Sequence, residues 1–427
     1  MTTLKAVRGT RDLLPPETAL WNRIEATARA VFARYNFGEI RTPVFEDTAL
    51  FARGVGEETD IVSKEMYTWE DRARAQSEKT QMLTLRPENT AGVVRAYIEH
   101  GLGESGQLQK LYYMGPQFRR ERPQKGRYRQ FSQIGAEVIG PPSAGSESPL
   151  RDAEVLEMLA TLLDELGITG WTLHLNSVGS AADRARYNEA LRAALLPVAS
   201  QLCEDCKRRA VTNPLRVLDC KVAADQPIID ALPVIADSLD EASKAHFAAV
   251  TAALDAAAVP YTRNHRLVRG LDYYTRTTFE FTHGGLGAQN ALLGGGRYDG
   301  LSEMLGGPRA PGIGFAMGED RLVLTLMAQE AAAPQVLADA YIAPLGEGMN
   351  AAALNLAREL RHQGLWIELG EGGFRLKKSF EAADKTARQI VILGEDELAS
   401  GILPVKNFST GIQTKVPRAE LAVFLSQ

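Results

Sequence analysis

Two apolar segments on either side of a strongly basic stretch constrain the fold more than any other feature of this sequence. Residues 110–114 and 129–139 either alternate or run apolar, as β-strands do. The stretch between them, from Phe118 to Phe131, is polar and highly charged. We therefore expect a long hairpin here, and with it an antiparallel sheet in the first half of the chain.

The rest of the first 330 residues mixes helix and strand patterns without the regular βαβ alternation of a doubly wound sheet. Apolar residues at helical spacing predict helices over 16–36 and 151–166. A strand is expected from Ile40 to Phe45, with Pro43 at an edge or an interface because proline cannot donate to a ladder. The later elements are expected to be strands at 265–281 and 290–293, then a helix from Glu319.

Changes in composition divide the chain into parts. Residues 181–258 are rich in Ala, Leu, Asp and Glu at helical spacing, which predicts a helical insertion at about 178–258 within a catalytic domain of residues 1–330. An alanine-rich linker is expected at 331–337. Beyond it, residues 338–427 predict a small α/β domain with its own parallel sheet. Its expected elements are strands at 340–344, 365–369 and 389–393 and helices at 350–363 and 377–387.

Composition excludes several classes. The chain has 427 residues, of which 45% are hydrophobic and 24% charged, as in ordinary globular proteins. Its formal net charge of -5 does not indicate a DNA-binding protein, although local basic strips remain compatible with RNA. No apolar run reaches the ~18 residues of a membrane span, and the N-terminus has no apolar signal segment. We expect a soluble, cytoplasmic protein without a membrane partner.

The cysteines leave two readings open. Cys203 and Cys206 form a C-x2-C pair, and thirteen residues separate Cys206 from Cys220. Three cysteines exclude a disulfide scaffold and indicate a reducing compartment. A structural zinc site needs four ligands, and no fourth cysteine or nearby histidine is visible. We favour free thiols over a zinc knuckle and predict no metal site.

The basic loop of the hairpin is the strongest candidate for chemistry. It holds six basic side chains and one acid between Arg119 and Arg129. A solvated charged turn is the ordinary explanation for such a run. However, Arg119 and Glu121 share one strand face, as do Gln133 and Glu137 on the return strand. A guanidinium binds phosphate with two hydrogen bonds and a carboxylate can bind an amine, so we expect a binding site.

Three further stretches are candidates. Glu88 and Thr90 follow an apolar strand, where they are also compatible with an ordinary helix start. The stretch from Arg269 to Tyr274 combines Arg-Gly with two tyrosines, and it fits either an aromatic core strand or a close ligand. The glycine-rich stretches 294–300 and 312–318, with Arg321 after them, are neither a P-loop nor a Rossmann fingerprint, and in the simplest reading they only make turns.

Together these stretches resemble the histidyl-tRNA synthetase family of class II aminoacyl-tRNA synthetases over nearly the whole chain. Residues 40–65, 113–137 and 311–324 are similar to class II motifs 1, 2 and 3. Arg269-Gly-Leu-Asp-Tyr-Tyr and Gly294-Gly-Gly-Arg-Tyr-Asp-Gly resemble the two histidine-specific signatures of the family. The resemblance implies an α+β fold, in which an antiparallel-sheet catalytic domain with a helical insertion precedes an α/β anticodon-binding domain.

The resemblance also implies roles for individual residues. Arg119 and Arg269 act at the α-phosphate of ATP as the catalytic pair. The remaining ATP-binding residues are Glu121, Phe131 and Arg321. The histidine-binding residues are Glu88, Thr90, Gln133, Glu137, Tyr273, Tyr274 and Tyr298. The residues expected to bind tRNA are Arg122, Lys125 and Arg127. Asn89 departs from the family pattern, because many members have glycine there, and whether its side chain crowds the amino-group site is left open by the sequence.

The implied reaction is a ligation in two steps. The histidine carboxylate attacks the α-phosphorus of ATP, and histidine then passes from histidyl-adenylate to the 3′ end of its tRNA. The implied cofactors are ATP and the Mg²⁺ that accompanies it, and the implied partners are L-histidine, tRNA(His) and a second copy of the chain in a homodimer. The alternative is a non-catalytic paralogue that serves as the regulatory subunit of ATP phosphoribosyltransferase. Such a subunit is expected to lack the C-terminal domain and to have degraded motifs.

Overall fold

The expected hairpin forms part of a large sheet in the computed structural model. Strands β5 and β6 pair antiparallel, from Gln109 opposite Ile139 to Phe118 opposite Gln130. The structure describes residues 3–56, 59, 61–71, 80–124, 126–268, 273–286, 290–329 and 337–426, and within these ranges the sheet has eight strands. Side by side, they are β1 (Gly38–Glu39), β5 (Gln109–Phe118), β6 (Gln130–Ile139), β11 (Gly312–Gly318), β10 (Ala291–Arg297), β9 (Thr275–His283), β7 (Trp171–Ser177) and β8 (Thr262–Arg263).

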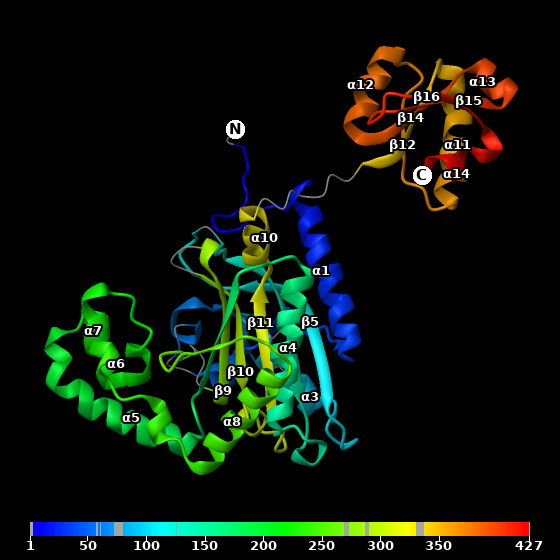
Figure 1. The fold of residues 1–427 in the computed structure, drawn as a ribbon. Coiled ribbons are helices and arrows are strands. Elements are labelled where there is room, and N and C mark those ends of the chain that lie inside the picture. Colours follow the sequence, from blue (N-terminus) through cyan, green and yellow to red (C-terminus); the bar gives the residue numbers. More distant parts are fainter. Residues whose placement is uncertain are drawn as a thin grey trace. The chain divides into compact units, whose positions relative to one another are not determined.

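Helices cover one face of this sheet (Figure 1). They are α1 (Glu17–Arg34), α4 (Pro149–Glu165), α8 (Glu241–Ala256) and α10 (Glu319–Ala328). Ser132 on β6 donates a hydrogen bond of 2.6 Å to Glu319 of α10. Ser132 therefore faces the helices, and since side chains alternate along a strand, Gln133 and Glu137 lie on the opposite face.

The strand expected from Ile40 to Phe45 was a wrong prediction. Gly38 and Glu39 pair with β5 of the large sheet, whereas Phe45 begins β2 in a separate sheet of order β2-β4-β3. The chain thus changes sheets at Pro43, which cannot donate to either ladder. These elements are β2 (Phe45–Asp47), α2 (Thr48–Val55), β3 (Tyr67–Asp71), β4 (Gln81–Leu85) and α3 (Thr90–Glu99).

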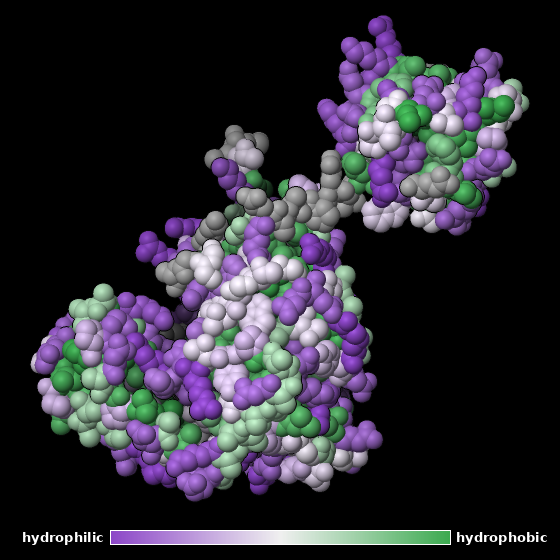
Figure 2. Space-filling view, in the orientation of Figure 1, coloured by the Kyte–Doolittle hydropathy of each residue, from purple (hydrophilic) through white to green (hydrophobic). Residues whose placement is uncertain are grey.

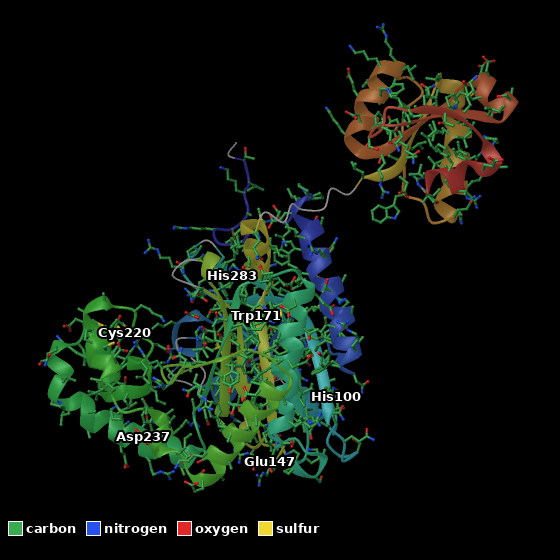
Figure 3. The ribbon with its side chains drawn as sticks, in the orientation of Figure 1. His100, Glu147, Trp171, Cys220, Asp237 and His283 are labelled. Carbon is green, nitrogen blue, oxygen red and sulfur yellow. The ribbon has the colours of Figure 1, made fainter. Side chains whose placement is uncertain are left out.

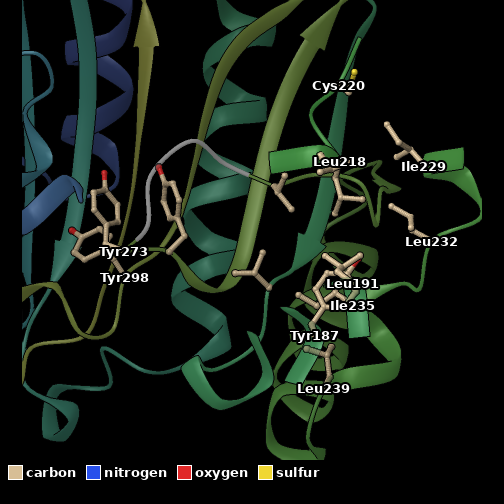
Figure 4. Close-up of a cluster of buried hydrophobic side chains, with 14 of the residues drawn as sticks. Tyr187, Leu191, Leu218, Cys220, Ile229, Leu232, Ile235, Leu239, Tyr273 and Tyr298 are labelled. Atoms are coloured by element: carbon tan, nitrogen blue, oxygen red, sulfur yellow. The ribbon is translucent and has the colours of Figure 1, made fainter. Parts of the chain in front are cut away.

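Short helices follow β7, as the composition predicts. They are α5 (Ala181–Leu195), α6 (Glu204–Thr212) and α7 (Gln226–Asp230), with 3-10 turns between them. Figure 4 shows Tyr187, Leu191, Ile235 and Leu239 gathered in one part of this region, and Leu218 and Ile229 nearer Cys220. The next helix, α8, packs on α4. Its His246 lies 3.5 Å from Asp152, so α8 belongs with the sheet and the inserted segment ends before it.

Residues 333–427 form a second compact unit. Its strands, in spatial order, are β13 (Ile367–Leu369), β12 (Ala338–Pro344), β14 (Ala387–Leu393), β15 (Ile402–Asn407) and β16 (Gln413–Pro417). The first three are parallel, as expected, but β15 and β16 run antiparallel, so the prediction of a purely parallel sheet was incomplete. Its helices are α11 (Asn350–His362), α12 (Leu376–Thr386), α13 (Glu395–Ser400) and α14 (Leu421–Leu425).

The helices and the surface were compared with what a membrane-spanning protein requires. Within the described residues, no helix is both long enough and apolar enough to cross a bilayer. On the face drawn in Figure 2, hydrophobic residues are interspersed with hydrophilic ones.

Candidate active site

The open face of the large sheet has a floor of small residues. On β11, Gly312, Gly314, Ala316 and Gly318 pair in turn with alternate residues of β6, from Ile139 to Gln133. Cβ atoms built at Gly312 and Gly296 would lie 2.4 Å from the Tyr298 ring and 2.7 Å from the Tyr274 ring. These glycines therefore sit in strands and make room for aromatic side chains, so the simpler reading that they only make turns was wrong.

A pocket opens over one end of this floor. Four of the five residues expected at ATP line it, namely Arg119, Glu121, Phe131 and Arg321. The pocket is also lined by residues of β10 and β11, namely Leu292, Leu293, Gly294 and Gly318. A Cβ built at Gly318 meets nothing within 4 Å, so the pocket has free space directly above β11.

Arg119 is held in this pocket by several contacts. Its Nε donates to the Pro87 carbonyl at 2.9 Å, and its guanidinium carbon lies 5.2 Å from the centre of the Phe131 ring. Glu121 is 3.8 Å from Arg119 and 3.1 Å from Arg127. The guanidinium of Arg119 is thus held at the wall of the pocket, and a guanidinium is a group that can bind a phosphate with two hydrogen bonds.

The acid pair before Arg321 anchors the pocket to other elements. Glu319 accepts from Ser132, and burial raises the pKa of its carboxyl to about 7. Asp320 accepts from Arg11 at 2.8 Å, and Arg11 stacks 4.8 Å from the centre of the Tyr128 ring at the pocket edge. The N-terminal segment thus helps to shape the pocket, which sequence reasoning did not anticipate.

Further along the same face of β6, Glu137 is completely buried. Its Oε1 accepts from Thr90 Oγ1 and its Oε2 from Tyr298 Oη, both at 2.7 Å. Burial raises the pKa of this carboxyl to about 8, and the nearby Glu88 adds to the effect, whereas the two hydrogen bonds oppose it. Glu137 is therefore protonated at neutral pH in the free protein.

Glu88 is the second buried carboxyl. Its oxygens accept the backbone N–H groups of Thr90 and Ala91 at the start of α3, at 2.8 and 3.0 Å. Burial raises its pKa. The Asn89 side chain, which departs from the family pattern, accepts a hydrogen bond of 2.6 Å from Thr42.

Tyrosine rings enclose Glu137. The Tyr273 ring lies 4.9 Å from that of Tyr274 and 5.9 Å from that of Tyr298. Tyr113 also belongs here but was missed, although the hairpin register offers the signal, since Tyr113 pairs with Gly135 between Gln133 and Glu137. Among the described residues, the buried Gln133 side-chain oxygen has no hydrogen-bond partner.

The remaining predicted residues are only partly described. Arg269 and Lys125 lie outside the described residues. Arg122 is exposed, and Arg127 both pairs with Glu121 and lines the pocket.

The open face of this sheet carries an arginine-lined pocket and two buried carboxyls, Glu88 and Glu137. With its largely antiparallel strands, this arrangement defines a class II aminoacyl-tRNA synthetase fold and confirms the expected fold class. A family model described as histidyl-tRNA synthetase matches residues 9–322, and one described as an anticodon binding domain matches residues 339–427. The chain belongs to the histidyl-tRNA synthetase family, as its sequence predicts.

Curated relatives are similar to this chain over nearly all of its residues. The chain is 73% identical to the histidine–tRNA ligase of Koribacter versatilis, over 99% of this chain and 96% of that one. It is 57% identical to the ligase of Solibacter usitatus, over 99% of both. Among solved structures, apo histidyl-tRNA synthetase of S. aureus is similar with a TM-score of 0.80 and 38% identity over 100% of both chains.

Proposed function

We propose that this chain is a histidine–tRNA ligase that forms histidyl-adenylate on the open face of its large sheet. The observation that carries the proposal is the pair of buried carboxyls, Glu88 and Glu137, beside the arginine-lined pocket. Burying two acids is unfavourable unless a cationic or hydrogen-bonding ligand compensates them. Histidine brings an ammonium group and an imidazole, which matches two such acids.

ATP occupies the arginine-lined pocket in this proposal and enters with its Mg²⁺. Arg119 and Arg269 hold the α-phosphate, while Phe131 and Arg321 lie on either side of the adenine and Glu121 faces its edge. As the histidine carboxylate attacks in line, negative charge grows on the α-phosphate oxygens. Guanidinium groups already in position stabilise that charge, so no side-chain nucleophile is needed.

Histidine lies over the buried acids. Glu88, Thr90 and Gln133 bind its ammonium group, and the unpartnered Gln133 oxygen supports this role. Glu137 binds the imidazole, with Tyr273, Tyr274 and Tyr298 around it. A carboxyl with a pKa of about 8 and an imidazole with an ordinary pKa of about 6.5 hold one proton between them at neutral pH. A side chain without two ring nitrogens leaves these groups unpaired and is rejected.

The partners follow from the family. Arg122, Lys125 and Arg127 contact the acceptor end of tRNA(His), and residues 339–427 bind its anticodon. Phosphate contacts of this kind position the tRNA, and base contacts select it. The reaction takes place in the cytoplasm, where tRNA is charged.

The three-stranded sheet supports a homodimer. Phe45 and Trp69 project from one face of it with 52% and 39% of their surface exposed, and their ring centres are 6.0 Å apart. Leu83 lies between their strands on the same face. Exposed aromatic clusters of this kind mark protein interfaces, and Phe45 belongs to the segment that resembles motif 1.

The regulatory-subunit alternative is less favoured. A solved chain described as ATP phosphoribosyltransferase regulatory subunit/histidyl-tRNA synthetase, from Bacillus halodurans, shares the fold with a TM-score of 0.66 but only 21% identity. This chain retains the arginines of the pocket, both buried carboxyls and the anticodon-binding match.

Histidine-dependent ATP–pyrophosphate exchange tests the proposal. We expect the purified chain, at a solution mass of two copies, to exchange pyrophosphate with histidine alone among the amino acids and without tRNA. A folded protein that binds histidine but gives no exchange with any amino acid contradicts the ligase and favours the regulatory paralogue. A monomeric mass with full exchange contradicts only the homodimer.

Glu137→Gln is expected to change how stability depends on pH. The folded-state pKa of about 8 lies above the unfolded value of about 4.5, so folded protein holds a proton that unfolded protein releases. Glu137 therefore lowers the free energy of unfolding as pH rises from about 5 to 8, on the order of 1 kcal/mol per pH unit. We therefore compare the two melting temperatures at each pH. The melting temperature of the variant minus that of wild type should increase by about 3 °C or more between pH 6 and pH 8. A difference that stays constant with pH contradicts the assignment.

A further inference from the structure

All three cysteines of the chain meet one aspartate in the helical insertion. Cys203 precedes α6, Cys206 lies in its first turn, and Cys220 and Asp225 follow a 3-10 turn. Their three sulfur atoms and a carboxylate oxygen all lie within 4.8 Å of one another. Figure 3 places Cys220 among the insertion helices, away from the labelled Trp171 and His283 of the sheet. Sequence reasoning missed this group because it looked for a fourth cysteine or a histidine.

The spacing of the four groups fits a tetrahedral ion. Ligands at the usual Zn–S distance of about 2.3 Å place two sulfurs about 3.8 Å apart. Cys203 Sγ and Cys220 Sγ are 3.9 Å apart, and Cys220 Sγ is 3.3 Å from Asp225 Oδ2. These two separations are close to those around a tetrahedral zinc ion, and the remaining ligand atoms, all within 4.8 Å of one another, need to move in by at most about 1 Å.

The surroundings hold these ligands in place. The Val222 N–H donates to Cys220 Sγ at 3.4 Å, and the Cys203 N–H donates to Asp225 at 3.1 Å. Backbone N–H groups directed at ligand atoms orient them and spread their negative charge. Cys206, Cys220 and Asp225 are buried and Cys203 is partly exposed, so the group is closed except on one side.

We propose that Cys203, Cys206, Cys220 and Asp225 bind one structural zinc ion. Three soft thiolates and one carboxylate in a closed four-ligand site suit Zn²⁺ better than Mg²⁺ or Ca²⁺, which prefer oxygen ligands in larger numbers. A disulfide between Cys203 and Cys220 would leave Cys206 and Asp225 without a role, whereas a metal uses all four.

The ion would join two parts of the insertion that are separate in the sequence. The start of α6 and residues 220–225 are connected through α6 itself and a 3-10 turn. Small modules of this kind are commonly stabilised by a metal. Cys206 and Cys220 also belong to the buried cluster seen in Figure 4, so the ion would tie ligands and core together.

Metal analysis of the full-length protein tests this directly, independently of its activity. We expect about one zinc per chain after purification in reducing buffer without chelator. After the metal is stripped, added Co²⁺ should give thiolate-to-cobalt charge-transfer absorption and the strong visible bands of tetrahedral cobalt. Less than a tenth of an equivalent of zinc, with no such absorption, overturns the proposal, as does a Cys203–Cys220 disulfide in protein without metal.

Two aspartate variants give a matched comparison. Asp225→Asn removes a proposed ligand, and we expect it to retain less than half of the zinc and to shift the cobalt spectrum. Asp205→Asn alters an exposed aspartate of α6 that pairs with Arg208 at 3.0 Å, and it should retain the metal fully. Cys206→Ser should abolish binding, and a chelator should lower the melting temperature of the wild type but not that of this variant. Equal zinc in both aspartate variants contradicts the ligand set.

Discussion

Replacing Arg119 by Gln is expected to lower kcat/KM for histidine-dependent ATP–pyrophosphate exchange by about 10²–10³-fold, the range measured when one positioned donor to a transition-state oxyanion is lost. Glutamine retains a donor but not the charge or the forked geometry that binds a phosphate. Arg119 lines the ATP-side pocket, where only its Nε is bound to the protein backbone. The measurement is steady-state exchange as ATP and histidine are varied separately.

Arg122→Gln is the matched control for that experiment. Arg122 is three residues away on the same loop and is exposed. We expect exchange without tRNA to stay within about twofold of wild type. Aminoacylation of tRNA(His) should weaken most at low salt and depend less steeply on the salt concentration than in wild type, because one phosphate contact is lost. Equal losses of exchange in both variants would show that the loop as a whole, rather than the Arg119 guanidinium, supports adenylate formation.

Sequence patterns predicted those parts of the fold in which one periodicity persists over many residues. Helices α1 and α4 and strand β6 lie within one or two residues of the expected ranges, because their buried faces repeat regularly, whereas β5 continues four residues past its expected end, to Phe118. The prediction failed at Ile40–Phe45, where the chain leaves one sheet for another and no local pattern records the change. Strands β15 and β16 were not predicted. They are short, and exposed residues occupy much of β16.

Sequence patterns likewise predicted some residues of the candidate site and not others. Residues with distinctive chemistry, such as Arg119 and Glu137, were found because their types and spacing are informative. Tyr113 was missed since a tyrosine in an apolar strand has the pattern of ordinary core. Asp225 was missed because its approach to the cysteines depends on two tight turns that spacing alone does not define.

Gly314→Ala is expected to be the most damaging single substitution on the open face of the large sheet. The need for glycine at this position of β11 follows from tertiary packing and is not visible in the sequence. A Cβ at Gly314 would lie 1.7 Å from Glu137 Oε2 and 2.7 Å from the Ala136 carbonyl oxygen. The carboxyl must move, but its bonds to Thr90 and Tyr298 oppose this, and the backbone of β6 cannot withdraw without breaking the ladder. We expect the melting temperature to fall by about 5 °C or more, as for overpacked cores that lose about 2–3 kcal/mol.

Histidine-dependent exchange should fall at least ~10²-fold in the same variant, because a displacement of about 1 Å in a ligand-positioning group has an effect of that size. Gly318→Ala is the matched control on the same strand and face, where a Cβ meets nothing within 4 Å. It should unfold at nearly the wild-type temperature and, because Gly318 lines the ATP-side pocket, raise the KM for ATP more than that for histidine. If Gly314→Ala keeps wild-type stability and histidine KM, then the close packing of Glu137 against β11 is not what positions the imidazole-binding carboxyl.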